Sequence, residues 1–178
     1  MKFTQTDLQD AVLIDIEPRD DARGFFSRMF CEKEFAEAGL VSKYVQHNYS
    51  FNHKRGTLRG MHYQNAPHRE VKVVQCVKGA IYDVIVDIRP ASPTYLLWRG
   101  FELSENNRRQ LYVPEGFAHG YVTLEDDSAV SYLVSAFYAP GAEGGLRWSD
   151  PAIGIDWPLE PDVISDKDAS WPDFKALA

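Results

Sequence analysis

The sequence is poor in cysteine and contains no long apolar run. Its two cysteines, Cys31 and Cys76, do not have the spacing of metal ligands, and nothing suggests a disulfide scaffold. Cys76 lies in an apolar segment, where a thiol behaves as a small hydrophobic side chain. The start of the chain lacks the apolar core of a signal peptide, and no segment approaches the roughly 20 apolar residues of a membrane span. We therefore expect a cytoplasmic protein without membrane contact.

Basic residues are also few relative to acidic ones. The 178 residues include 19 Lys and Arg against 26 Asp and Glu, a net charge of -7, which argues against a nucleic-acid partner. Hydrophobic residues at 44% and charged residues at 25% are ordinary for a globular protein. The length is that of one domain with a sizeable core, so we expect a single domain over residues 1–178.

Short segments with a period of two dominate the pattern and predict an all-β barrel or sandwich. One short helix is expected at residues 32–38, ended by Gly39. Periodicity fades after Pro140, and we expect residues 141–178 to form an ordered segment that packs on the barrel through its tryptophans. The expected strands are residues 11–17, 25–30, 44–50, 60–64, 71–77, 81–88, 95–103, 111–113, 117–124 and 129–138.

Residues 56–88 carry the most informative pattern. In GMHYQ, a period of two places His62 and Gln64 on one face. Residues 71–77 are rich in valine, a short turn follows at Lys78-Gly79-Ala80, and residues 81–88 alternate between apolar and acidic faces. Two strands joined by a tight turn, with polar groups on one inner face, are typical of a small barrel that holds a ligand.

The histidines and glycines resemble the motifs of the cupin superfamily. Gly56 precedes His62 with the expected spacing, but Gln64 stands where a second histidine ligand is usual, and Glu70 lies near the glutamate position. Pro114-Glu115-Gly116-Phe117-Ala118-His119 matches the second motif. A neutral amide is a poor replacement for an imidazole on a transition metal, so the pattern indicates a cupin-like barrel without a metal site.

A closer resemblance covers residues 12–172, nearly the whole chain. It is to the dTDP-4-dehydrorhamnose 3,5-epimerase family of metal-independent cupins. The resemblance implies a cupin-type β-barrel (jelly roll) with a few short helices, a nucleotide-sugar substrate, a homodimer, and no metal or organic cofactor. The sequence blocks that carry it are RGFF (23–26), QxNxS (46–50), LRGMHYQ (58–64), DVxVDxR (83–89), PxGFAHG (114–120), WxDP (148–151) and SDKD (165–168).

Epimerisation next to a ketone requires a base on one face of the sugar, an acid on the other, and a donor for the enolate oxygen. Histidine suits the base because its unperturbed pKa is about 6.5. The resemblance assigns His62 as the base, Asp168 as its partner, Tyr132 as the acid and Lys72 as the enolate stabiliser. A buried lysine in a valine-rich strand is costly without a partner, and Asp83 on a neighbouring strand is a candidate for that partner.

The resemblance also implies the substrate-binding residues. Three are cations that suit a diphosphate, Tyr138 stacks on the nucleotide base, and the rest are hydrogen-bonding side chains. Arg28 and Leu133 depart from the family pattern, which carries a glutamate and a lysine there, and both bear on the exact substrate. The implied binding residues are Arg23, Gln46, Asn48, Arg59, His119, Tyr138, Glu143 and Lys167.

Several interpretations stay open at this stage. The enzyme could epimerise C3 or C5 alone, or use a sugar on another nucleotide. A metal-dependent cupin and a non-catalytic sugar-binding cupin belong to different functional classes. His119 is as compatible with a structural remnant as with binding, and the role of Asp168 depends on the C-terminal segment folding back over the barrel.

Overall fold

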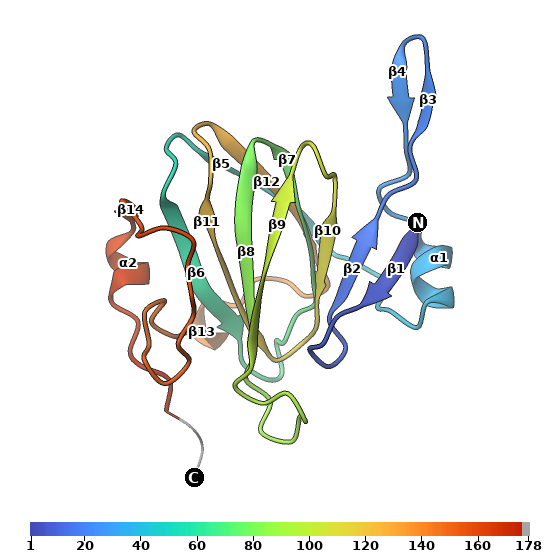
Figure 1. The fold of residues 1–178 in the computed structure, drawn as a ribbon. Coiled ribbons are helices and arrows are strands. Elements are labelled where there is room, and N and C mark those ends of the chain that lie inside the picture. The colour runs from blue at the N-terminus through green and yellow to red at the C-terminus, as the bar shows by residue number, and fades with distance from the viewer. Residues whose placement is uncertain (176–178) are drawn as a thin grey trace.

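The computed structural model describes residues 1–175, which form two β-sheets packed face to face as a jelly roll (Figure 1). The first sheet has the order β1-β2-β10-β7-β12-β5. Its strands are β1 (Lys2–Gln5), β2 (Val12–Asp15), β10 (Gln110–Val113), β7 (Lys72–Lys78), β12 (Ser128–Val134) and β5 (Gln46–Asn52). The predicted all-β barrel class is confirmed.

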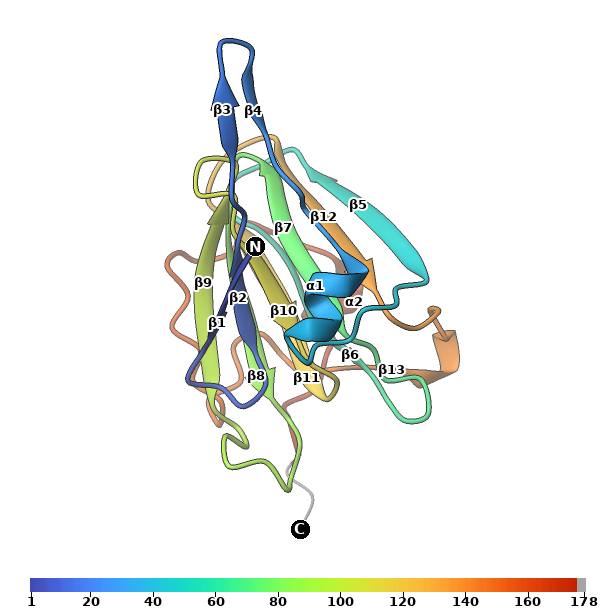
Figure 2. The ribbon, with the colours of Figure 1, turned by 90° about the vertical axis from the view of Figure 1, so that its right-hand side faces the viewer.

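The second sheet has the order β13-β6-β11-β8-β9, with β14 pairing in parallel to β6. Its strands are β13 (Glu143–Gly145), β6 (Thr57–Gln64), β11 (Phe117–Thr123), β8 (Ala80–Asp87), β9 (Trp98–Ser104) and β14 (Val163–Ile164). A separate hairpin of β3 (Arg19–Asp21) and β4 (Gly24–Phe26) projects away from both sheets (Figures 1 and 2).

The helices are short. The predicted helix is present as α1 (Glu32–Glu37), and Gly39 follows it with a φ of +73° that favours glycine. Helix α1 lies on the outer face of the first sheet (Figure 2). Phe35 of this helix packs in one buried cluster with Val12, Val73 and Tyr112. A 3-10 turn, η1, spans Pro140–Ala142, and α2 spans Asp166–Ala169. Neither α-helix in residues 1–175 is long and apolar enough to cross a membrane.

The chain between β7 and β8 differs from the prediction. The two strands are not paired as a hairpin, because β7 belongs to the first sheet and β8 to the second. Gly79, with a φ of +71°, lies at the corner where the chain passes from one sheet to the other. A tight turn with glycine can connect two paired strands of a hairpin or two strands of different sheets. The long-range pairing of β7 with β10 and β12 shows that the second connection is present.

The predicted alternation along residues 81–88 is confirmed. Ile81 and Ile85 point between the sheets, into the main core with Val74 and Leu111. The alternate side chains face outward, where the C-terminal segment covers them. That outer cluster contains Tyr82, Val84, Val86, Met61, Ala118, Leu146, Ile153 and Trp157. Because both faces of β8 are covered, all of its residues except the partly exposed Tyr82 are buried, although the strand alternates in polarity.

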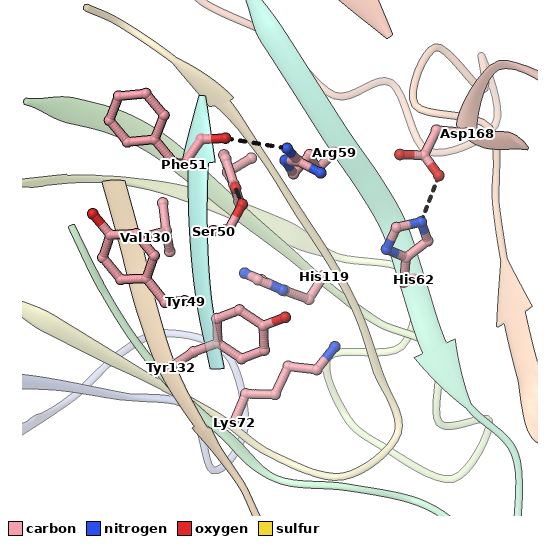
Figure 3. Close-up of a pocket in the computed structure, with 11 residues that line it drawn as sticks. Tyr49, Ser50, Phe51, Arg59, His62, Lys72, His119, Val130, Tyr132 and Asp168 are labelled. Atoms are coloured by element: carbon pink, nitrogen blue, oxygen red, sulfur yellow. Dashed lines mark hydrogen bonds and ion pairs between the residues drawn. The ribbon is translucent and has the colours of Figure 1, made fainter. Parts of the chain in front are cut away.

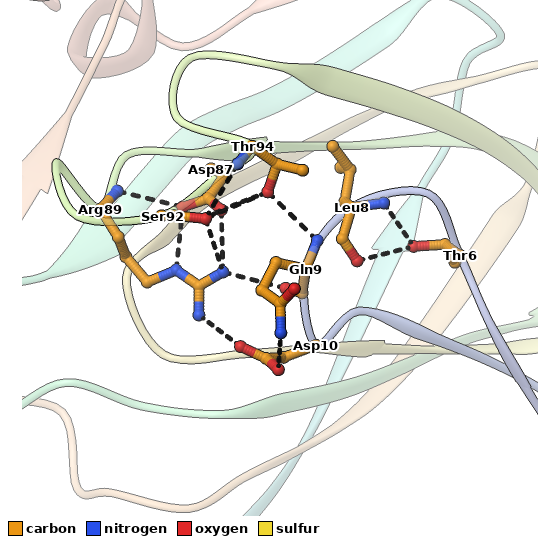
Figure 4. Close-up of polar contacts among 8 residues, drawn as sticks. All are labelled: Thr6, Leu8, Gln9, Asp10, Asp87, Arg89, Ser92 and Thr94. Atoms are coloured by element: carbon orange, nitrogen blue, oxygen red, sulfur yellow. Dashed lines mark hydrogen bonds and ion pairs between the residues drawn. The ribbon is translucent and has the colours of Figure 1, made fainter.

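A polar network surrounds the buried Asp87 at the end of β8 (Figure 4). Asp87 has 0% exposure and accepts hydrogen bonds from Arg89, Ser92 and Thr94. Arg89 also pairs with Asp10, so the network ties the loop before β2 to the end of β8. Burial would raise the pKa of Asp87, but these hydrogen bonds outweigh it and hold that pKa below its ordinary value.

Candidate active site

A cavity of about 440 Å³ opens between the two sheets (Figure 3). An adjoining cavity of about 330 Å³ shares His62, Lys72 and Tyr132 with it, so these three side chains lie where the two spaces meet. The first branch is also lined by Tyr49, Ser50, Phe51, Arg59, His119, Tyr121, Val130 and Asp168. The second is also lined by Gln46, Asn48, Tyr63, Gln64, Glu70, Val134, Tyr138 and Glu143.

His62 and Asp168 form a hydrogen-bonded pair at this junction. The His62 Nε2 atom lies 2.7 Å from Asp168 Oδ1, and the Gly60 N–H donates to Asp168 Oδ2 at 3.2 Å. Burial alone would raise the pKa of Asp168, but the hydrogen bonds from His62 and Gly60 outweigh it and keep that pKa below its ordinary value. An ionised Asp168 requires His62 Nε2 to carry the proton, which leaves Nδ1 as the acceptor.

An irregularity in β6 turns Arg59 onto the same face as His62. His119 on β11 lies opposite His62, whereas Tyr121 lies opposite Arg59, so β6 carries one extra residue over this interval. Residues three apart in a regular strand point to opposite faces. Gly60 makes the irregularity possible, because its φ is +122° and a Cβ there would lie 2.6 Å from the Gly120 Cα.

Tyr132 and Lys72 enter the cavity from the first sheet, across from His62 (Figure 3). Burial is the main cause that raises the pKa of Tyr132, and the negative charge of Glu70 adds to it. The Lys72 Nζ atom lies 3.2 Å from Glu70 Oε1, with 12% and 13% of the two side chains exposed. Glu70 is therefore the carboxylate partner of Lys72, and the candidate named from the sequence, Asp83, is not.

Asp83 pairs instead with His119. The His119 Nε2 atom lies 2.9 Å from Asp83 Oδ2, and Asp83 is fully buried. His62 and His119 are cross-strand neighbours, so two His–Asp pairs face the same cavity. His119 is thus both a lining residue and a buried, satisfied histidine.

A hydrogen-bonded chain fixes Arg59 beside this pair. Arg59 Nε donates to Asn52 Oδ1 at 2.8 Å, and Asn52 Nδ2 donates to the Tyr121 hydroxyl at 3.3 Å. Ser50 Oγ lies 3.0 Å from the same hydroxyl. Asn52 is 2% exposed, so a buried amide holds the guanidinium at the edge of the cavity.

A second polar cluster lies at the far end of the other branch. Glu143 Oε2 accepts hydrogen bonds from Lys167 Nζ at 2.6 Å and from the Tyr138 hydroxyl at 3.0 Å. The Tyr138 N–H donates to Gln46 Oε1 at 3.1 Å. Lys167 precedes Asp168 on α2, so one short helix serves both the histidine and this cluster. Tyr138 is 56% exposed.

Comparisons with known proteins place this site in a family. The sequence model of the dTDP-4-dehydrorhamnose 3,5-epimerase family matches residues 5–176. The dTDP-4-dehydrorhamnose 3,5-epimerase of Shigella flexneri is 43% identical over 98% of this chain and 96% of its own length. The chain belongs to the dTDP-4-dehydrorhamnose 3,5-epimerase family. The predicted family is confirmed, and membership makes the protein an enzyme of the isomerase class.

Solved structures agree with this assignment. The dTDP-4-dehydrorhamnose 3,5-epimerase of Bacillus anthracis, with TDP and PPi bound, has a TM-score of 0.94 at 41% identity, covering 97% of this chain and 99% of that one. The dTDP-6-deoxy-D-glucose-3,5-epimerase of Legionella pneumophila, in complex with dTDP-4-keto-L-rhamnose, has a TM-score of 0.91 at 37% identity, covering 97% and 92%. The cupin-type barrel of the family is thus present almost in full.

Both departures from the family pattern lie away from the two cavities of this epimerase. Arg28 pairs with Glu34 of α1 at 2.6 Å. Leu133 follows Tyr132 on β12 and therefore points to the opposite face of the sheet, where it packs with Val73 and Phe35 on the outside of the first sheet. Within one chain, neither residue lines the space around His62.

Arg23 is the one predicted residue that the chain does not bring near the others. It lies in the turn of the β3–β4 hairpin, with 89% of its side chain exposed, and pairs with Asp21 at 2.5 Å. The remaining predicted residues line one of the two branches, or contact a residue that does, as Lys167 contacts Glu143.

Several lining residues of this family member were not predicted, and periodicity would have found some of them. Ser50 continues the face of Gln46 and Asn48, and Tyr121 lies two residues after His119. Glu70 was considered only as the glutamate of the cupin motif and was not predicted as a residue of this site. Gln64 uses its amide to contact Glu70, His68 and Ala139. No group of three or more metal-binding side chains is gathered among residues 1–175.

Proposed function

We propose that the protein epimerises C3 and C5 of dTDP-4-dehydro-6-deoxyglucose, giving dTDP-4-dehydrorhamnose. The observation that carries this proposal is the position of His62 with Asp168 on one wall of a cavity, across from Tyr132 and Lys72 on the other. A base and an acid on opposite sides of one sugar ring are what inversion next to a ketone requires. Family membership supplies the substrate class.

His62 Nδ1 takes the proton from the carbon beside the C4 ketone. The C–H electron pair becomes a double bond to C4, and the carbonyl π pair moves onto the C4 oxygen to give an enolate. Asp168 stabilises the resulting imidazolium through the hydrogen bond at 2.7 Å. The enolate oxygen at C4 accepts a hydrogen bond from the Lys72 ammonium. Partial enclosure between the two sheets strengthens these charge interactions, because solvent screens them less there than at the protein surface.

Tyr132 returns a proton to the opposite face of the same carbon. Burial raises its pKa, so the phenol stays protonated at neutral pH and is available as an acid. Two rounds, first at one carbon and then at the other, complete the reaction, with proton exchange with solvent restoring both groups. No metal or organic cofactor has a step in this scheme.

Binding residues surround this centre in both branches. Tyr138 stacks on the nucleotide base, with Lys167, Glu143, Gln46 and Asn48 beside it. Arg59 and His119 approach from the other branch. The whole chain acts as one domain, because the segment after residue 140 supplies Glu143, Lys167 and Asp168 to a barrel built from the preceding residues.

We also propose that the protein acts as a homodimer in the cytoplasm. The projecting β3–β4 hairpin exposes 72% of Phe26 beside the exposed Arg23, an arrangement suited to insertion into a second copy. Arg23 of the partner subunit would then complete the site. Mixing Arg23→Ala chains with His62→Ala chains tests this, since only a mixed dimer contains one intact site. Recovery of activity supports exchange between subunits, and no recovery contradicts it.

Proton exchange by NMR tests the reaction itself. The protein is incubated in D2O with dTDP-4-dehydro-6-deoxyglucose, and deuterium is followed at C3 and C5. Exchange at both carbons, lost in His62→Ala, is expected. The Tyr132→Phe variant should still exchange protons but accumulate little inverted product, because the base remains while the opposite acid is gone.

The other outcomes distinguish the rival functions. Exchange at one carbon only identifies a mono-epimerase. If the wild type shows no exchange with the dTDP-linked sugar but converts the same sugar on another nucleotide, the substrate is that other nucleotide sugar. A rate that follows added metal indicates a metal-dependent cupin, and nucleotide-sugar binding without exchange indicates a binding protein.

A further inference from the structure

Glu70 lies between a cation, Lys72, and a neutral amide, Gln64, in the second branch of the cavity. Its Oε1 atom is 3.2 Å from Lys72 Nζ, and its Oε2 atom accepts a hydrogen bond from Gln64 Nε2 at 3.1 Å. Only 13% of the Glu70 side chain is exposed. Each carboxylate oxygen therefore has one partner, and the carboxylate cannot rotate without losing one of them.

Gln64 is itself held in place on every side. It is 5% exposed, and its Oε1 atom accepts from the Ala139 N–H at 2.8 Å while Nε2 donates to the His68 carbonyl at 3.0 Å. These backbone groups come from two different connections of the barrel. Because a buried amide with several partners has one orientation, the contact to Glu70 has a fixed direction.

Lys72 has no other carboxylate among the ion pairs of residues 1–175. The other carboxylates around the cavity are committed, since Asp168 pairs with His62, Asp83 with His119, and Glu143 with Lys167. A lysine with 12% exposure would carry a large desolvation cost without a partner. Glu70 therefore compensates the ammonium charge and also restricts a side chain that has four rotatable carbons.

We propose that Glu70 is a positioning residue for Lys72, holding its ammonium group toward the C4 oxygen of the sugar. Gln64 acts behind it by fixing the carboxylate. An ammonium has three N–H donors, so one contact to Glu70 leaves others for the enolate. This inference depends on the proposed function, because Lys72 needs a defined direction only if an enolate forms in front of it.

Glu70→Gln removes the charge and keeps the shape and the contact to Gln64. The expected result is a fall in kcat of about 10-fold to 100-fold with KM nearly unchanged, because the ammonium is misplaced in the transition state. Glu102→Gln, the same change at an exposed position on β9, is the matched control and should keep wild-type kinetics.

A double variant separates positioning from a general structural effect. In a Lys72→Met background, Glu70→Gln should cause no further fall in kcat, because the group through which it acts is absent. A further fall of the same size as in the wild type would overturn the proposal. Wild-type kcat in Glu70→Gln would overturn it as well.

Glu70→Asp keeps the inference testable if Glu70→Gln does not fold. Aspartate retains the charge but withdraws the carboxylate by one carbon, so positioning predicts a fall in kcat of about 10-fold, whereas simple charge balance predicts none. Failure of the proposed function is distinguishable, because the wild type would then show no exchange at C3 or C5 in D2O. Wild-type exchange with unchanged Glu70 variants refutes the positioning role alone.

Discussion

Replacing Asp168 with asparagine changes the charge at the centre of the site with little change in size. The amide of the Asp168→Asn variant can still accept one hydrogen bond, but it has no negative charge to face the imidazolium that the proposed reaction forms at His62. Asp168 is 5% exposed, so little solvent reaches the group. The substitution therefore acts mainly on the step that removes the sugar proton.

The size of the effect follows from the geometry. Unit charges 2.7 Å apart attract by about 6 kcal/mol at an effective dielectric constant of about 20. His62 keeps 31% of its side chain exposed, so solvent screens part of this attraction. A hydrogen bond to a charged partner, worth about 1.5–3 kcal/mol, is the closer measure. The expected fall in kcat is about 10-fold to 150-fold.

The assay is the rate of deuterium incorporation at saturating substrate, between about pH 6 and pH 8. The pKa of Asp168 is depressed in the folded protein, so the pair contributes stability above the unfolded pKa of roughly 3.9 and loses it as pH falls through the folded value. Asp168 therefore stays ionised in the wild type throughout the assayed range, and the wild-type and variant rates are compared at about pH 8.

The control is Asp166→Asn, which removes an exposed carboxylate from the same helix. It should keep the wild-type rate and the wild-type melting temperature. An Asp168→Asn variant that folds and turns over at the wild-type rate would refute the role given to the pair. Equal losses in both variants would point to damage of α2 instead.

Three other changes have defined outcomes. Tyr132→Phe should lower inverted product by about 100-fold to 10,000-fold while exchange into substrate persists, as seen by NMR. Asp87→Asn should lower the free energy of unfolding by about 3 kcal/mol in urea titrations at neutral pH, because it breaks a buried pair with Arg89. This difference should shrink as pH falls through the depressed folded-state pKa of Asp87, and a constant difference would contradict it. Gly60→Ala should cost about 3 kcal/mol, since its Cβ would meet the backbone of Gly120, and a neutral effect by the same titration would contradict the close packing.

The fold class was predictable because period-two alternation is a local property. The helix at residues 32–38 and the alternation along residues 81–88 were predicted correctly, each from neighbours in the chain. Strand β1 was missed because four mixed residues carry little periodicity. The segment at 71–88 was misinterpreted as a hairpin, because a tight turn does not reveal which sheet each strand joins.

The candidate site was predictable where the family pattern names a residue, and unpredictable where a partner had to be chosen. Lys72 was correctly expected to need a carboxylate, but Asp83 and Glu70 are equally plausible in the sequence. Which carboxylate reaches Lys72 depends on the direction in which the side chains of β8 point and on the path of the loop before β7. In the structure Glu70 pairs with Lys72, and Asp83 pairs with His119.

The residue types and their alternation already specify a barrel with a polar lining, together with the family to which it belongs. Those properties depend on local side-chain direction and on residue identity, which the chain carries directly. The site itself depends on contacts between distant segments. His62 meets Asp168 across 106 positions, and Arg59 joins His62 only because β6 carries an extra residue against β11. Arg23 lies on an exposed hairpin away from these residues, and no local pattern in the sequence indicates this position.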